Sequence, residues 1–210
     1  MSDDLELVTA WRGGDSLAGE RLVERHLEAV HRFFSNKVYG SAEDLVQKTF
    51  LACVEAVDGF EGRASFRTYL FAIARNVLHR FYRDGDGDFD PLTASVATRV
   101  ADDGSPADRF AARQEQRLLL RALRALPLEL QTLLELAYWE GLADRELAEI
   151  LEMPAGTIKS RLRKARQQLD HALSTLAPSP ALLESSRHTF ESWANQIREK
   201  TGIEGGKGRR

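Results

Sequence analysis

Hydrophobic side chains recur at steps of three and four along most of the chain, which is the spacing of one buried face on an α-helix. This pattern predicts helices over residues 5–39, 42–57, 65–83, 110–126, 128–142 and 144–151, and a last helix that begins near residues 154–156 and runs past 169. Within the first range, Gly13 and Gly14 interrupt the pattern, and Asp15 is suited to cap the helix that follows. The predicted fold class is therefore all-α.

The predicted helices between residues 15 and 83 carry enough apolar residues for a core of their own. Gly40 is expected to end the helix before it, and residues 41–44 resemble a capping box for the next helix. The residues expected to pack inward are Leu17, Leu22, Val23, Leu27, Val30, Phe33, Phe34, Val46, Phe50, Cys53, Val54, Val57, Phe66, Tyr69, Leu70, Ile73, Val77 and Phe81.

A helix-turn-helix is predicted over residues 141–169. The turn, residues 152–156, contains Pro154 and Gly156, and proline is tolerated in the first turn of the helix that follows. The first helix carries apolar residues for packing on the second: Leu147, Ala148, Ile150 and Leu151. The second helix carries one apolar stripe: Ile158, Leu162, Ala165, Leu169 and Leu173.

The other face of this second helix is polar and basic, and no acidic residue interrupts residues 159–166. A helix of this kind can lie in the major groove, where arginine bonds guanine and both cations neutralise phosphates. The expected DNA contacts are Thr157, Lys159, Ser160, Arg161, Arg163, Lys164 and Arg166. The alternative is a helical hairpin with a solvated basic face, but the Gly/Pro turn at this spacing favours DNA.

The predicted helix over residues 65–83 interleaves basic, amide and aromatic side chains on its outer face. This combination suits single-stranded nucleic acid, in which bases stack on rings and the backbone meets cations. The alternative is that the aromatic rings belong to the core. The outer residues are Arg67, Arg75, Asn76, His79, Arg80, Tyr82 and Arg83.

The composition changes near residue 84, where Asp, Gly, Ser, Ala and Pro replace the periodic pattern. We therefore expect a helical domain over residues 1–84, a flexible acidic linker over 85–109 and a helix-turn-helix domain over 110–176. Residues 177–210 form a tail in which 181–199 are amphipathic and the end is expected to be disordered.

Overall composition limits the possible functions. The chain has 210 residues, of which 43% are hydrophobic and 29% charged, with a formal net charge of −3, so any nucleic-acid affinity must come from local patches. The single cysteine, Cys53, fits a reducing compartment. Neither a signal peptide nor an apolar run long enough to span a membrane is present, so we expect a cytoplasmic protein without membrane insertion.

Residue patterns for catalysis are missing from the sequence. It contains no glycine-rich phosphate loop and no nucleophile elbow, and its five histidines are scattered without cysteine partners at metal-ligand spacing. We therefore expect no catalytic residues, no bound metal and no cofactor.

Four segments together make the chain resemble the extracytoplasmic-function (ECF) sigma factors, the small specificity subunits of bacterial RNA polymerase. They are AEDLVQKTFLACVEAV, FEGRASFRTYLFAIARN, ALRALPLELQTLLELAYWEGL and ELAEILEMPAGTIKSRLRKARQQL, within residues 10–173. The resemblance implies a non-catalytic subunit that directs core polymerase to promoters through −35 and −10 elements. It also implies contacts with the β′ clamp helices and the β flap, and regulation by an anti-sigma factor.

The resemblance also assigns roles to single residues. Residues 157–166 match the helix that reads the −35 element, and the linker would thread towards the RNA exit path. The residues that match the clamp-binding helix are Glu43, Asp44, Leu45, Gln47 and Lys48. The residues that match the loop and helix that recognise and open the −10 element, capturing a flipped base near Asn76, are Phe60, Arg63, Phe66, Arg67, Arg75, Asn76, His79, Arg80 and Arg83.

Three positions depart from the family pattern. Tyr69 stands where tryptophan is usual, and Arg80 stands where aspartate is common, which makes the surface beyond Asn76 more basic. Ala143 replaces a usual serine cap, and Asp144 is the expected substitute. The tail beyond Ala177 exceeds the minimal family length, and its amphipathic part, with Phe190 and Trp193, is expected to pack on one of the domains.

Three other functions compete with this prediction. A conventional helix-turn-helix regulator shares the second domain but leaves the helices around Asp44 and Asn76 unexplained. A decoy or adaptor would bind polymerase without starting transcripts. An enzyme acting on small molecules lacks any catalytic group of residues.

Overall fold

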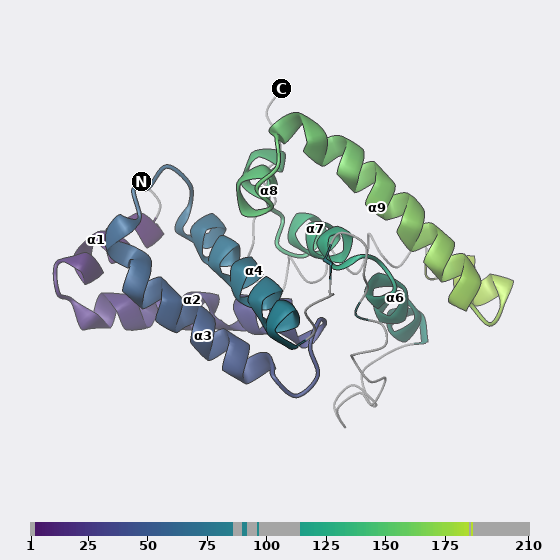
Figure 1. The fold of residues 1–210 in the computed structure, drawn as a ribbon, viewed down its shortest axis with the longest axis horizontal. Helices are drawn as coiled ribbons and strands as arrows, with labels where there is room; N and C mark the ends of the chain where they lie inside the picture. The colour runs from purple at the N-terminus through teal and green to yellow at the C-terminus, as the bar shows by residue number, and fades with distance from the viewer. Residues whose placement is uncertain (1–2, 86–89, 92–95, 97–113, 185, 187–210) are drawn as a thin grey trace. The chain divides into compact units, whose positions relative to one another are not determined.

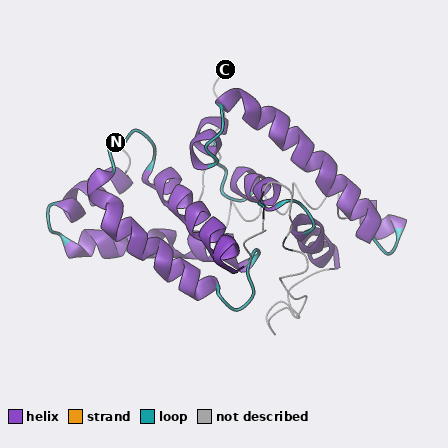
Figure 2. Ribbon diagram, viewed as in Figure 1, coloured by secondary structure: helices purple, strands orange, loops and turns teal. Residues whose placement is uncertain are grey.

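The computed structural model describes residues 3–85, 90–91, 96, 114–184 and 186. The structured elements in these ranges are all helical, as Figures 1 and 2 show, so the all-α prediction is confirmed. The chain divides into two compact units, one built mainly from residues 1–89 and the other from most of residues 90–210. Most of the expected linker, residues 85–109, lies outside the described residues. No helix in the described ranges is both long and apolar enough to cross a membrane.

Four α-helices and one 3-10 turn build the first unit. They are α1 (Asp3–Arg12), α2 (Ser16–Ser35), α3 (Ala42–Ala56), η1 (Val57–Gly59) and α4 (Phe66–Gly85). Helix α2 packs against α1, α3 and α4. Asp15 caps α2 as predicted, because its carboxylate accepts hydrogen bonds from the backbone N–H groups of Leu17 and Ala18. The buried side chains of the core include Leu22, Val30, Phe34, Leu45, Cys53, Leu70, Phe71, Ala74 and Leu78.

The sequence analysis assigned too many residues to the core of this unit. Leu17, Leu27 and Val54 are 60%, 45% and 50% exposed. In α3 the buried stripe instead includes Leu45 and Thr49. The Thr49 hydroxyl donates to the carbonyl of Leu45 at 2.7 Å, so this polar residue is satisfied inside the core. Apolar spacing alone could not reveal that stripe, because a threonine interrupts it.

Two boundary predictions and one surface prediction are also wrong. Helix α2 ends at Ser35, and Gly40 lies in the following loop with a φ of +68°. Ser41 makes no side-chain capping bond to α3. Tyr82, expected on the outer face of α4, is buried, and its hydroxyl donates to the carbonyl of Lys37. The ring therefore serves the core, which was the alternative left open for aromatic residues.

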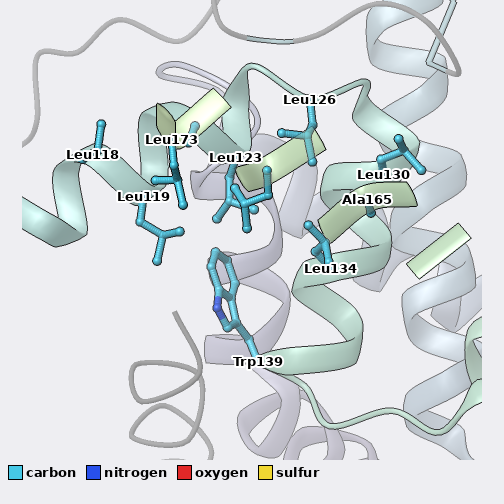
Figure 3. Close-up of a cluster of buried hydrophobic side chains, with 11 residues drawn as sticks. Leu118, Leu119, Leu123, Leu126, Leu130, Leu134, Trp139, Ala165 and Leu173 are labelled. Atoms are coloured by element: carbon cyan, nitrogen blue, oxygen red, sulfur yellow. The ribbon is translucent and has the colours of Figure 1, made fainter. Parts of the chain in front are cut away.

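The second unit consists of α6 (Gln114–Arg124), α7 (Leu128–Tyr138), α8 (Asp144–Ile150) and α9 (Ala155–Leu176). Helix α9 packs against α6 and α7. Figure 3 shows leucines of α6 and α7 and the ring of Trp139 facing residues of α9 in one cluster. Its buried members are Leu118, Leu119, Ala122, Leu123, Leu126, Leu130, Leu134, Trp139, Ala165, Leu169 and Leu173. Ala165, Leu169 and Leu173 belong to the apolar stripe that the sequence predicted for α9.

The helix-turn-helix is confirmed, with α8 and α9 as its helices. The turn has a Schellman geometry: the Met153 N–H donates to the Ala148 carbonyl at 2.9 Å, and the Glu152 N–H donates to the Glu149 carbonyl at 3.4 Å. Glu152 adopts a φ of +53°, a left-handed conformation that usually favours glycine. The two backbone hydrogen bonds of the turn therefore compensate for the strained conformation of Glu152.

The cap of α8 differs from the prediction. The Ala143 carbonyl accepts the first helical bond from Leu147, so Ala143 holds the N-cap position and Asp144 is the first helical residue. The Glu146 carboxylate accepts a hydrogen bond from the Ala143 N–H at 2.9 Å. This is the return half of a capping box, which works without a side-chain oxygen at the cap itself.

Near its start, the tail contains a short helical stretch over residues 180–184 and 186. Leu182 and Leu183 pack against the core cluster of the second unit. The rest of the expected amphipathic helix, including Phe190 and Trp193, lies outside the described residues.

Candidate nucleic-acid interface

The first candidate surface is the basic face of α9. Its apolar residues Ile158, Ala165 and Leu169 are buried, which orients the remaining side chains outward. Thr157 and Arg161 are half-buried at one flank. The exposed residues of this face are Lys159, Ser160, Arg163, Lys164 and Arg166.

Two of these side chains have local partners within the second unit. The Arg166 guanidinium lies over the Tyr138 ring, 5.2 Å from its centroid. The Ser160 hydroxyl donates to the Thr157 carbonyl at 2.8 Å. The other exposed cations form a surface with no acid between residues 159 and 166, and so carry a local positive potential despite the net charge of −3.

The second candidate surface is the loop between η1 and α4. Phe60 is buried where the loop begins, and Gly62 has a φ of +69°, which turns the chain outward. Ser65 caps α4, because its hydroxyl accepts a hydrogen bond from the Thr68 N–H at 3.1 Å. Between these fixed ends, Glu61 and Arg63 are exposed and form an ion pair with each other.

An aromatic cluster lies under this loop. The Phe60 ring centroid is 5.0 Å from that of Tyr69 and 6.0 Å from that of Phe66. The Tyr69 hydroxyl donates to the Ala56 carbonyl at 2.9 Å, and burial raises the pKa of Tyr69. Phe60 and Phe66 are only 6% and 3% exposed, so they support the loop instead of presenting their rings to solvent. The sequence indicated aromatic residues here but not which way they face.

The outer face of α4 continues this surface. Asn76, Arg80 and Arg83 are exposed and lie one turn apart, on one face of the helix. The Arg67 guanidinium lies 5.8 Å from the centroid of the Phe71 ring. Arg67, Arg75 and His79 are half-buried. A polar and basic strip therefore runs along α4 beyond the loop.

The third candidate surface is the first turn of α3. Glu43, Asp44, Gln47 and Lys48 are exposed, whereas Leu45 is 1% exposed and belongs to the core. Lys48 Nζ lies 2.7 Å from Asp44 Oδ2. The pKa of Glu43 is lowered, first by a hydrogen bond from its own backbone N–H and then by His31, whose Nε2 lies 3.6 Å from Glu43 Oε1.

An apolar groove beside this turn was missed by the sequence analysis. It runs between α2 and α3 with a volume of about 840 Å³, and we call it the α2–α3 groove. Its apolar lining residues are Val23, Leu27, Val46, Phe50, Leu51 and Val54, and its acidic rim is Glu24, Glu28 and Glu43. The only sequence signal was that α3 carries apolar residues on more than one face, which the prediction assigned to the core.

The described residues contain no group of three or more histidine, cysteine or acidic side chains placed to hold a metal ion. Cys53 is buried in the first unit, and burial raises its pKa to about 11. A thiol with this pKa stays protonated near neutral pH, so Cys53 acts as a packing residue.

Two protein-family models match the segments that carry these surfaces. The sigma-70 region 2 model matches residues 22–87, and the sigma-70 region 4 model matches residues 116–169. The first match contains the α3 turn, the loop and α4, and the second contains the helix-turn-helix. A regulator built only from the second unit would leave the first match unexplained.

Individual proteins and solved structures are similar over most of the chain. The ECF RNA polymerase sigma-E factors of Haemophilus influenzae and of Escherichia coli K12 are each 28% identical over 182 residues, covering 82% of this chain and 96% and 95% of theirs. The sigma factor RpoE of Bartonella quintana, solved with the anti-sigma factor NepR, is 27% identical with a TM-score of 0.57, covering 74% of this chain and 96% of its own. CnrH, solved with the cytosolic domain of CnrY, shares the fold with a TM-score of 0.63 at 23% identity, covering 83% of this chain and 99% of its own. Two sigma-70 regions that together cover more than half of the chain, and ECF sigma factors similar over 82% of it, show that this protein belongs to the ECF sigma factors.

Proposed function

We propose that this sigma factor divides promoter recognition between its two units. Its family supplies the non-catalytic subunit that directs core RNA polymerase to promoters. In our proposal residues 110–176 read the −35 element, residues 1–84 bind the polymerase clamp and open the −10 element, and residues 85–109 link the two. The observation that carries the proposal is the exposed, acid-free basic face of α9 opposite a buried apolar stripe.

The −35 element would be read by α9 in the major groove. The Ser160, Arg163 and Lys164 side chains point away from the core and can reach base edges. Thr157, Lys159, Arg161 and Arg166 lie at the flanks, where they suit phosphates. Phosphate contacts supply the salt-dependent affinity, and base contacts supply the selectivity.

The −10 element would be opened by the loop 60–65 and the strip on α4. Extruding a base from a duplex costs a few kcal/mol, which binding of that base in a pocket offsets. Arg63, Asn76, Arg80 and Arg83 are the exposed side chains that can hold the single strand. Arg67, Arg75 and His79 border this strip, and the buried Phe60 and Phe66 hold the loop above the core.

The first turn of α3 would dock on the β′ clamp helices. Glu43, Asp44, Gln47 and Lys48 form the exposed polar part of this surface, and Leu45 holds it on the core. The second unit would meet the β flap, and the linker would run towards the RNA exit path.

A run-off transcription assay tests the whole proposal. Purified core polymerase is supplied with genomic fragments of the source organism, with and without this protein. New transcripts that share spaced −35 and −10 motifs are the expected result. Binding to core polymerase without new transcripts would favour a decoy, and duplex binding by the protein alone would favour a conventional regulator.

We also propose that an anti-sigma factor controls this protein by covering the α2–α3 groove. RpoE of Bartonella quintana and CnrH were both solved with a partner protein, and Leu27, Leu51 and Val54 expose apolar surface here. An anti-sigma candidate from the same genome should silence the run-off assay. Val54→Asp should weaken that inhibition, because it places a charge on an apolar contact surface. Equal inhibition of both proteins would place the partner elsewhere.

A further inference from the structure

Arg12, the last residue of α1, is bonded to the loop that we assign to −10 recognition. Its Nη1 donates to the Phe60 carbonyl at 3.0 Å, and its Nη2 donates to the Asp58 carbonyl. Its Nε lies 3.9 Å from the Asp58 carboxylate. One guanidinium therefore bonds two carbonyls, that of Asp58 in η1 and that of Phe60 at the start of the loop. The forked N–H donors of arginine are suited to such a pair of bonds.

Helix α1 is held in place by contacts that do not involve Arg12. Val8 is 1% exposed in the core of the first unit. Asp4 accepts hydrogen bonds from Arg25 and from His26, whose Nε2 lies 3.0 Å from Asp4 Oδ2. Asp3 forms a second ion pair with Arg25. The N-terminal turn of α1 is thus fixed on α2, so the position of Arg12 does not depend on the loop.

Two further close approaches bring side chains of α1 next to α2 and next to the loop. A Cβ built at Gly19 would lie 2.8 Å from Trp11 Nε1, so only glycine lets the indole lie this close to α2. A Cβ built at Gly62 would lie 3.4 Å from Leu5 Cδ1, which puts Leu5 beside the turn of the loop. The loop is therefore held from one side by α1 and from beneath by the aromatic cluster.

We propose that Arg12 is a positioning residue for −10 selectivity: through its bonds to η1 and to Phe60, it holds the loop 60–65 in the shape that receives the extruded base. This inference rests on the proposed function of that loop. Helix α1 lies outside the region matched by the sigma-70 region 2 model, which begins at residue 22. In this inference, a helix outside the matched region helps to set the specificity of the loop.

The test compares three variants in the full chain, assembled with core polymerase. Arg12→Ala removes both hydrogen bonds, and Arg12→Lys keeps the charge but reaches one carbonyl. Arg21→Ala is the control, because Arg21 is an exposed arginine on α2. The readout is the ratio of run-off transcription from a promoter with the preferred −10 base to that from a promoter with this base replaced.

Arg12→Ala is expected to lower this ratio about 3- to 10-fold, the size of a charged hydrogen bond that solvent partly screens. Arg12→Lys should fall between Arg12→Ala and the wild type, and Arg21→Ala should leave the ratio unchanged. Binding to core polymerase should be equal in all four proteins. Amide hydrogen exchange in η1 and the loop 60–65 should become faster in Arg12→Ala, while exchange in α9 stays the same.

Four results would overturn the inference. A wild-type ratio at wild-type output in Arg12→Ala would show that the loop holds its shape without this residue. An equal loss of output on every promoter, which leaves the ratio unchanged, would indicate a general loss of active protein. A wild-type ratio in Arg12→Lys would mean that charge alone is sufficient. A wild-type holoenzyme with no −10 base preference would instead overturn the proposed function of the loop, and this inference with it.

Discussion

The burial pattern of α9 predicts which arginine reads bases and which binds phosphate. At about 100° per residue, Arg163 lies about 160° around the helix from the buried Ala165, and Arg166 lies about 100° from it. Arg163 therefore points away from the core, and in the proposed complex it would face the major groove of the DNA. Arg166 lies at the flank over Tyr138, where a phosphate would pass. Arg161 lies about 40° from Ala165 and is half-buried, so it is less well placed for a base edge.

The two substitutions are expected to change different quantities: the base preference for Arg163→Ala, and the salt dependence of binding for Arg166→Ala. A bidentate arginine–guanine contact contributes about 1–3 kcal/mol of discrimination, so Arg163→Ala should reduce the preference for the correct −35 base roughly 5- to 150-fold. Arg166→Ala should weaken binding to all sequences alike. It should also reduce the slope of log affinity against log salt concentration by about 0.9, the release for one phosphate contact.

The assay is binding of holoenzyme to promoter duplexes with correct and substituted −35 elements, over a series of salt concentrations. Arg166→Lys is the matched control, because it keeps the charge and should keep the slope. The reasoning from burial would be refuted if Arg166→Ala changed the base preference and Arg163→Ala changed only the salt slope.

Three further predictions concern stability. Leu134→Ala should cost about 2–5 kcal/mol in urea unfolding, because Leu134 is fully buried in the core cluster; a loss below 1 kcal/mol would contradict that packing. Tyr69→Phe should cost about 0.5–1.5 kcal/mol in the same assay, because it removes the hydrogen bond to Ala56; an unchanged midpoint would show that this bond is not formed in solution. Burial raises the pKa of Asp4, but hydrogen bonds and charges of His26 and Arg25 outweigh it, so the net pKa lies below 3.8. The stability difference between wild type and Asp4→Asn should therefore be full above pH 3.8 and shrink below it; a difference that grows on acidification would reverse the sign.

Much of the fold was predictable because its signals are local. Each of these signals involves residues that are only a few positions apart in the sequence. Examples are the spacing of Leu119, Leu123 and Leu126, the Asp15 cap and the turn at Pro154. They place helices and the helix-turn-helix without knowledge of any partner. The basic face of α9 followed for the same reason, since it is the complement of one apolar stripe.

The orientation of surface and core residues was less predictable. Leu27 and Val54 have the same hydrophobicity as core residues, yet they border an exposed groove. Tyr82 looked like part of a nucleic-acid surface, but its hydroxyl finds the Lys37 carbonyl 45 residues away and its ring is buried. Apolar spacing shows which residues can be buried, and only the neighbouring helices decide which residues are.

The sequence by itself determined the two helical regions, the helix-turn-helix and its cationic face, because helix periodicity, caps and breaks depend on near neighbours. Only the tertiary structure decided that Phe60 and Phe66 are buried beneath the loop 60–65 and that an apolar groove stays open beside α3. Only the tertiary structure also joined Arg12 to the carbonyl of Phe60, 48 residues along the chain. Contacts over such separations arise when helices pack against one another, and no local pattern in the sequence encodes them.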